Sequence, residues 1–189
     1  MNRPNKIEQA AYHEAGHAVA AYLLHERFAG LEMTVVDGPD GSFYTRRRRS
    51  GQDKWTNTLN EKYVMIYSAG AIAEQLLGVH VQTTDYIDIW GAVRHAWSIA
   101  NNLDEMLTHY RQLVERTKNL LEYEPNWSAV QALARELVER KRIDERRARQ
   151  IIQQATKKEV GIEEKHTEIK KNKGTESEGI TRTTSQRTE

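Results

Sequence analysis

Apolar residues recur at helical spacing along most of the chain. The stretch from Ile7 to Phe28 has this periodicity and contains no proline, so it predicts a first helix that begins after Pro4 and ends near Arg27. Closer to the other end, apolar side chains fall at i, i+3, i+4, i+7 and i+8, which places them on one face of a helix. These residues are Val130, Leu133, Ala134, Leu137 and Val138.

Further helices are predicted between and after these two. Asn60 can serve as the N-cap of a helix that runs to Leu77, because the following Gly78 is a typical stop signal. Pro125 separates two other helices, since proline lacks the amide hydrogen that a helix interior requires. The remaining helices are expected over about Asp85 to Asn101, Leu103 to Tyr123, from Asn126 or Ser128 onwards, and over Glu145 to about Thr156.

One segment has the pattern of strands instead. Leu31 to Val36 and Ser42 to Arg47 form two short extended runs on either side of the sequence Asp-Gly-Pro-Asp-Gly. A glycine-rich turn between two such runs is typical of a β-hairpin. The sequence therefore predicts a mainly α fold of about five to six helices with a small β-hairpin.

Composition limits the domain organisation. The chain has 189 residues, no cysteine and a formal net charge of +1, which fits one domain with a moderate core. We expect that domain to span residues 1–156. Residues 157–189 are expected to form a disordered charged tail, because too few aliphatic residues stand among the charged and hydroxyl side chains. The aliphatic residues there are Val160, Ile162, Ile169 and Ile180.

The same composition bears on location and on metal chemistry. No apolar run approaches the roughly 18 residues of a membrane span, and the N-terminus lacks the pattern of a secretory signal. We therefore expect a cytoplasmic protein without a membrane span. The absence of cysteine excludes disulfides and thiolate zinc sites, so any metal must bind to His, Asp or Glu.

Three sets of conspicuous side chains have simple interpretations. Arg46 to Arg49 could contact nucleic acid, but short charge runs more often form a solvated face, so nucleic-acid binding is not expected. The many arginines between residues 135 and 149 alternate with acids, which favours pairing on the helix surface. The tryptophans are expected to anchor the core or an interface. They are Trp55, Trp90, Trp97 and Trp127.

Residues 13–17 read His-Glu-Ala-Gly-His, an H-E-x-x-H pattern inside the first predicted helix. Side chains four apart lie on one face of a helix, so His13 and His17 can present two imidazole nitrogens to one metal ion. A catalytic zinc takes three protein ligands and keeps a further position for water, whose pKa falls towards about 7. Glu14 lies on the neighbouring side of the helix, where its carboxylate can take a proton from that water and pass it to a leaving amine.

This pattern is short, and two histidines at this spacing can also be solvated side chains or a satisfied pair in the core. His13 and His17 continue an apolar stripe that includes Ala10 and Ala20, which favours their burial. Buried imidazoles need partners, since an unpaired polar group is costly in the core. A mid-helix glycine costs about 1 kcal/mol relative to alanine, so Gly16 indicates close packing or function.

Several ordered motifs resemble the FtsH family of membrane-anchored, ATP-dependent proteases. The run from Ala11 to Val19 resembles the zinc-binding helix of that family, and Ser68 to Glu74 resembles its Ala-Gly-x-x-Ala-Glu helix. The resemblance covers about residues 7–152. Its other matching segments are Thr83-Thr84 with Asp88-Ile89, which resemble the part that carries the third zinc ligand, and Ala132 to Leu137, Ile143-Asp144 and Ile151-Ile152, which are similar to the closing helices.

The resemblance implies zinc bound by His13, His17 and Asp88, with Glu14 as the general base. The FtsH phosphate-binding loop, G-x-x-x-x-G-K-[ST], and a transmembrane helix do not occur in this sequence. We therefore expect a zinc metallopeptidase that hydrolyses peptide bonds in unfolded or flexible polypeptides without ATP-driven unfolding. The edge strand of the hairpin could pair with an extended substrate.

The third ligand has competitors. The spacing after the threonines differs by one residue from that of the family, so Asp85 is an alternative. Asp88 is preferred because that register also places Ala92 correctly and puts the carboxylate on one stripe with His95. Glu74 is a further candidate ligand, although a role in holding a histidine ring through its free N–H suits it better.

A second interpretation of the whole chain is also open. It is a catalytically silent, zinc-stabilised binding or regulatory module derived from the peptidase fold. As partners of a peptidase we expect a peptide or unfolded protein substrate, and the sequence leaves open whether a homo-oligomer or a partner ATPase assists it.

Overall fold

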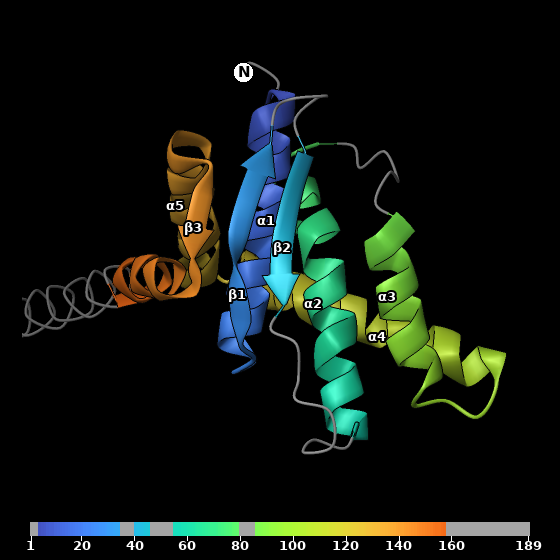
Figure 1. Cartoon of the computed structure of the whole chain (residues 1–189). Helices are drawn as coiled ribbons and strands as arrows, with labels where there is room; N and C mark the ends of the chain where they lie inside the picture. Colours follow the sequence, from blue (N-terminus) through green and yellow to red (C-terminus); the bar gives the residue numbers. More distant parts are fainter. Residues whose placement is uncertain (1–3, 35–39, 46–54, 80–85, 158–189) are drawn as a thin grey trace, which may run out of the picture.

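Helix α1 lies at the centre of the fold, with helices on either side and a small sheet across it (Figure 1). The computed structural model describes residues 4–34, 40–45, 55–79 and 86–157. The predicted mainly α class is confirmed, with six helices in this part of the chain. The elements are α1 (Lys6–Leu23), β1 (Phe28–Thr34), β2 (Asp40–Thr45), α2 (Asn57–Leu76), α3 (Tyr86–Trp97), α4 (Leu103–Glu122), α5 (Glu124–Arg140), β3 (Arg142–Asp144) and a final helical segment over residues 145–157.

Helix α1 has a well-defined start and a sharp end. The Asn5 side chain accepts a hydrogen bond from the Glu8 amide, and the Glu8 carboxylate accepts one from the Asn5 amide, each at 2.9 Å. The helix ends at Leu23, about one turn before the predicted end. That prediction was wrong because His25 takes a left-handed φ of 59°, which turns the chain away although apolar residues continue.

The sheet has three strands rather than the two of a simple hairpin. Strand β1 pairs antiparallel with β2 and with β3, in the order β2-β1-β3. Leu31 of β1 lies opposite Phe43 of β2 and opposite Ile143 of β3. The predicted hairpin is therefore confirmed, and β3 is an addition. Its only buried residue is Ile143, so the strand is too short to give a periodic signal.

Two apolar clusters fix the helices. The larger one joins α1, the sheet, α5 and the final helical segment, and its fully buried members include Leu133, Leu137 and Ile152. The smaller one places α3 and α4 against α2. It contains Val64, Met65, Ala92, Ala96, Met106 and Leu113. The position of α3 therefore depends on its small inward residues.

Two helix starts differ from the prediction. Helix α2 begins at Asn57, where Thr56 is the N-cap and accepts a hydrogen bond from the Leu59 amide at 3.2 Å. Asn60, the predicted cap, instead lies buried inside the helix. Helix α5 begins at Glu124, so Pro125 lies in its first turn. Proline is tolerated there because the amide hydrogen that it lacks would have no partner within the helix. Gly78 has a φ of +83° just after α2, as a stop signal requires.

Helix α3 exposes most of its aromatic residues. Trp90 and Trp97 are 70% and 52% exposed, and Trp55 before α2 is 50% exposed, so a core position was wrong for these three and an interface role stays a prediction. Trp127 packs against the larger apolar cluster, as predicted. The inward face of α3 is taken by Asp88, Ala92 and His95 at helical spacing, which turns Trp90 and Trp97 outward. The periodicity of α3 cannot distinguish the two faces, because both carry apolar residues.

Three of the arginines between residues 135 and 149 form the predicted surface pairs. Arg140 and Arg147 both contact Glu136, and Arg149 pairs with Glu145 at 3.0 Å. None of the described helices combines the length and the apolar character needed to cross a membrane. Arg46 to Arg49 and residues 158–189, most of the predicted tail, lie outside the described residues.

Small residues let α1 and α2 come close together. A Cβ atom at Gly16 would lie 2.5 Å from the Ala69 carbonyl oxygen and 2.8 Å from the Ala73 Cβ atom. Ala11, Ala15 and Ala18 of α1 are fully buried as well. The two backbones are therefore separated by almost no side-chain volume at this crossing.

Replacing Gly16 by alanine is expected to destabilise the protein, even though alanine favours helix by about 1 kcal/mol. The new Cβ would meet a backbone oxygen of α2, which cannot move without shifting that helix. Overpacking typically costs about 1–3 kcal/mol, so we expect a net loss on the order of 1 kcal/mol in the free energy of unfolding. Urea denaturation measures this loss.

Thr108→Ala, on the exposed face of α4, is the control, because it changes helix propensity without adding atoms to a contact. It should be neutral or stabilising. If Gly16→Ala were as stable as the unmodified protein, the close crossing of α1 and α2 would be contradicted.

Candidate metal centre

His13 and His17 form a buried pair on the face of α1 that meets α2. Their exposed fractions are 5% and 3%, so the burial expected from the apolar stripe is confirmed. The rings lie edge to face, with centroids 4.7 Å apart and an angle of 75° between the planes. The four-residue spacing on one helix thus brings the two imidazoles together, as the sequence predicts.

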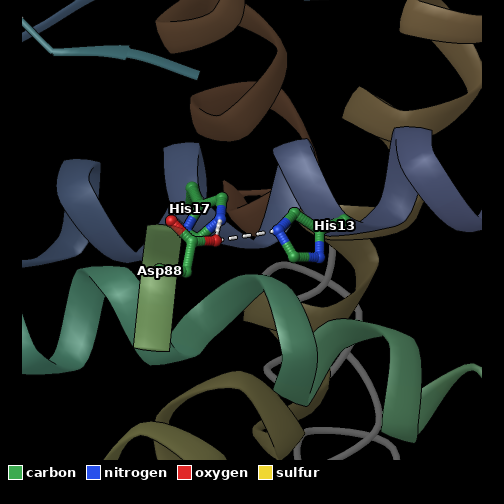
Figure 2. A group of neighbouring side chains, drawn as sticks. All are labelled: His13, His17 and Asp88. Atoms are coloured by element: carbon green, nitrogen blue, oxygen red, sulfur yellow. Dashed lines mark hydrogen bonds and ion pairs between the residues drawn. The ribbon is translucent and has the colours of Figure 1, made fainter. Parts of the chain in front are cut away.

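Asp88 reaches this pair from the first turn of α3 (Figure 2). Its Oδ2 atom lies 3.0 Å from Nε2 of His13 and 2.8 Å from Nε2 of His17. Ligand atoms of the three residues all lie within 4.8 Å of one another, so the group could hold a metal ion. Asp85, the sequence competitor for the third position, lies outside the described residues.

Each imidazole is held from behind through its Nδ1 atom. His17 Nδ1 lies 2.7 Å from the carbonyl oxygen of Ile66, which can only accept, so this nitrogen donates. The Nε2 atom of His17, which faces Asp88 at 2.8 Å, is therefore the nitrogen left for a metal ion. His13 Nδ1 lies 2.6 Å from Oε1 of Glu74. The structure thus brings Glu74 to the nitrogen of His13 that does not face Asp88.

Gly70 of α2 leaves space beside the ligand atoms. A Cβ atom there would lie 2.5 Å from Nε2 of both His13 and His17. Any other residue would fill the space next to both nitrogens, so glycine is required for steric reasons and not for its backbone freedom. Helix α2 therefore supplies room at Gly70 and, one turn later, the carboxylate of Glu74.

The charges of the site are strongly coupled. Burial disfavours the protonated form of His13, but the hydrogen bonds to Asp88 and Glu74 outweigh it and raise its pKa from 6.5 to about 10. Burial alone would raise the pKa of Asp88, but its contacts with His13 and His17 hold that pKa well below the usual value. An imidazolium of His13 and a carboxylate of Asp88 thus stabilise each other, and a cation would compete for the same atoms.

Glu14 is buried next to the histidines. Its side chain is 5% exposed, and its negative charge contributes to the raised pKa of His13. The Glu14 carboxylate of α1 is therefore close enough to affect the charge of the ligand atoms, as Asp88 and Glu74 also do. A general base beside a metal site requires this kind of placement.

The sheet borders the site through Phe43. The ring of Phe43 stacks on His17, with centroids 5.6 Å apart and planes inclined by 24°. Phe43 belongs to β2, which is an edge strand among the described strands. An extended chain paired with β2 would therefore run close to the histidine pair.

A polar contact between α2 and α3 was not predicted. The buried His95 has its Nδ1 atom 2.8 Å from Oδ1 of Asn60. The rings of Tyr63, Tyr67 and Trp55 lie around His95, with centroids 4.9 to 5.8 Å from its own. The sequence placed His95 on the inward stripe of α3, but Asn60 was interpreted as a cap. The signal that could have identified it is its position on one helical stripe with Tyr63 and Tyr67.

Comparison of the chain with models of known protein families and with curated proteins gives no match. The chemistry assigned to the site therefore depends on its own residues and their arrangement.

Proposed function

We propose that the chain is a zinc-dependent endopeptidase that cleaves unfolded or flexible polypeptides without ATP-driven unfolding. One observation carries the proposal: ligand atoms of His13, His17 and Asp88 lie together beside the buried carboxylate of Glu14. Three protein ligands with a neighbouring acid are the parts that hydrolysis at a zinc site requires.

The donor set favours zinc over other common ions. Two imidazole nitrogens and one carboxylate oxygen suit zinc, whereas magnesium and calcium prefer oxygen donors throughout. The Glu74 and Ile66 contacts orient the two rings, as outer partners of metal-binding histidines commonly do. The space at Gly70 lies beside the nitrogens that would bind. The residues present therefore fit a zinc ion.

The zinc ligands and Glu14 have different roles in the proposed hydrolysis. When bound, zinc would supply a Lewis acid for the scissile carbonyl and lower the pKa of a water molecule towards about 7. Glu14 takes a proton from the attacking water, whose oxygen forms a bond to the carbonyl carbon. Glu14 then passes this proton to the amide nitrogen as the C–N bond breaks. The products are a carboxylic acid and an amine, which together account for all atoms of the water.

Strand β2 supports an extended substrate. Among the described strands its outer edge has no partner and can accept a further strand, and its Phe43 stacks on His17. Backbone pairing of this kind needs a chain that is already unfolded, because a folded segment has its amides engaged elsewhere. Peptides and flexible segments are therefore the proposed substrates.

One observation favours the second function, a zinc-stabilised module without catalysis. The residues of the site come from α1 and α3, and α2 contacts both histidines, so a bound ion would tie three helices together. Such a role needs the ligands but not Glu14. The two functions therefore differ in what a change of Glu14 does.

Asp88→Asn is expected to remove zinc binding more strongly than Glu74→Gln does. The first change deletes a negatively charged ligand, while the second weakens only the support of His13, for which a loss of about 10–100-fold in affinity is typical. Metal content after dialysis and competition with a chelating dye measure both. Full zinc retention by Asp88→Asn would reject its assignment as a ligand.

Glu14→Gln is expected to abolish cleavage of casein or a quenched peptide while zinc stays bound. Loss of a general base typically lowers kcat by about 10²–10⁴-fold, and the amide keeps the size of the side chain. Zinc content and thermal unfolding of the same preparation serve as controls. Undiminished cleavage by pure Glu14→Gln protein would reject this mechanism, and equal inactivity of the unmodified zinc-loaded protein would favour the silent module.

The stabilisation by zinc is expected to increase with pH. In chelator-treated protein the folded pKa of His13 is about 10 against 6.5 ordinarily, so its contribution to stability is complete below 6.5 and is lost as pH rises towards 10. Asp88 has a lowered pKa, so its contribution is present above its ordinary 3.8 and is lost as pH falls through its lower folded pKa. Zinc must displace the proton of His13, so its apparent affinity rises with pH.

The measurement is the difference in Tm between zinc-loaded and chelator-treated protein, which should grow between about pH 6 and pH 8. In Asp88→Asn the ion pair with His13 is absent, so the chelator-treated variant should lose less stability over this interval. A difference in Tm that stays constant with pH would contradict the coupling between His13 and the metal.

A further inference from the structure

We propose that Tyr67 is a catalytic residue whose hydroxyl donates a hydrogen bond to the carbonyl oxygen of the scissile bond. This inference rests on the proposed peptidase function and names a residue that the H-E-x-x-H pattern does not include.

Tyr67 continues the stripe of α2 that builds the metal centre. Glu74 holds His13, and Gly70 lies against Nε2 of both histidines. Tyr67 precedes Gly70 by three residues, which places it one turn away on the same face. Its ring therefore stands at the border of the site, next to the space that Gly70 leaves.

The other side of the ring is set by α3. A Cβ atom at Gly91 would lie 2.8 Å from Cδ1, Cε1 and Cζ of Tyr67, so the ring lies directly against the α3 backbone. Asp88 precedes Gly91 by three residues and is therefore on the same side of α3. The ring of Tyr67 therefore fills the contact between its own helix α2, which supports the histidines, and α3, which carries the proposed third ligand.

A third contact restrains the plane of the ring. The Tyr67 ring stacks on His95, with centroids 5.8 Å apart and planes inclined by 20°. His95 is in turn held by Asn60, which accepts a hydrogen bond from its Nδ1 atom at 2.8 Å. Two buried polar residues therefore position an aromatic ring that is itself only partly buried.

The charge around Tyr67 keeps its hydroxyl a donor. Burial and then the negative charge of Asp88 raise the pKa of Tyr67 above its ordinary value of 10.0. Tyr67 is therefore protonated at neutral pH, and its position one turn before Gly70 places it at the border of the space where a substrate carbonyl would lie.

A donor at this place acts on the charge that develops during hydrolysis. When the water oxygen adds to the carbonyl carbon, the electron pair of the C=O bond moves to the carbonyl oxygen. A fixed O–H donor stabilises that oxygen more than it stabilises the neutral carbonyl, so it accelerates the step without tightening substrate binding. No proton has to leave Tyr67.

The main test compares Tyr67→Phe with Tyr63→Phe in the zinc-loaded chain of 189 residues. Tyr63 is on the same stripe but one further turn from the histidines, and its ring also contacts His95, with centroids 5.1 Å apart and planes inclined by 34°. Removal of one oxyanion donor typically costs about 10²–10³-fold in kcat. We expect this loss for Tyr67→Phe with KM little changed, and a nearly unchanged kcat for Tyr63→Phe.

Binding of a phosphinic peptide provides a readout besides activity. This compound mimics the tetrahedral oxyanion, so calorimetry should show weaker binding by about 10²-fold when Tyr67→Phe is added to zinc-loaded Glu14→Gln protein. A plain peptide of the same sequence should bind equally to both proteins. If Tyr67 only packs against α3, both ligands should bind as before, and the inference is overturned.

Gly91→Ala tests the positioning of the ring. The added methyl group would push against Tyr67, so kcat should fall in the unmodified background and should not fall further in Tyr67→Phe. Equal losses in both backgrounds would mean that Gly91 acts independently of the hydroxyl, which counts against the inference.

The outcomes separate this inference from the proposed function. Cleavage by Tyr67→Phe with the kcat of the unmodified protein overturns the role of Tyr67 and leaves the peptidase proposal standing. An unmodified, zinc-loaded protein that neither cleaves peptides nor binds the phosphinic peptide overturns the peptidase proposal, and the role of Tyr67 is rejected with it.

Discussion

The close crossing of α1 and α2 is the constraint on which the rest of the structure depends. Each helix contributes a glycine at the contact: Gly16 of α1 meets the backbone of Ala69, and Gly70 of α2 meets the rings of His13 and His17. The two glycines therefore have complementary roles, since one allows the backbones to approach and the other leaves room for the imidazoles. Glycine lowers helix propensity at both positions, and the contact compensates for that cost.

Burial of two histidines follows from this crossing and makes partners necessary. Helix α2 supplies them at once, through the Glu74 carboxylate for His13 and the Ile66 carbonyl for His17. Both contacts use Nδ1, so both Nε2 atoms point to the same space. Asp88 can then complete the group only if α3 packs closely on α2, which its small inward residue Ala92 permits.

The local part of this arrangement could be predicted from the sequence, and the part that depends on tertiary contacts could not. The spacing of His13 and His17 fixes their common face, because a helix places residues four apart together. The contact with the Ile66 backbone carbonyl cannot be predicted from a side-chain pattern, since every residue has a carbonyl group. Asn60 has the composition of a cap but is buried against His95, where a partner on another helix decides its role. Strand β3 was not predicted for a similar reason. Its three residues are too few to show a pattern, and it is a strand because it pairs with β1.

The ion pairs within the site do not compensate all of its negative charge. Glu14, Glu74 and Asp88 are three carboxylates around two imidazoles, and the raised pKa of His13 gives one of these rings a positive charge at neutral pH. Among these five described side chains, ionised carboxylates therefore outnumber the imidazoles even when both rings are protonated, and an excess of negative charge is costly where the dielectric is low. A divalent cation relieves it more fully than a single proton can, because it brings two charges to the same atoms. The carboxylates that raise the pKa of His13 are thus the groups that would favour exchange of its proton for a metal ion.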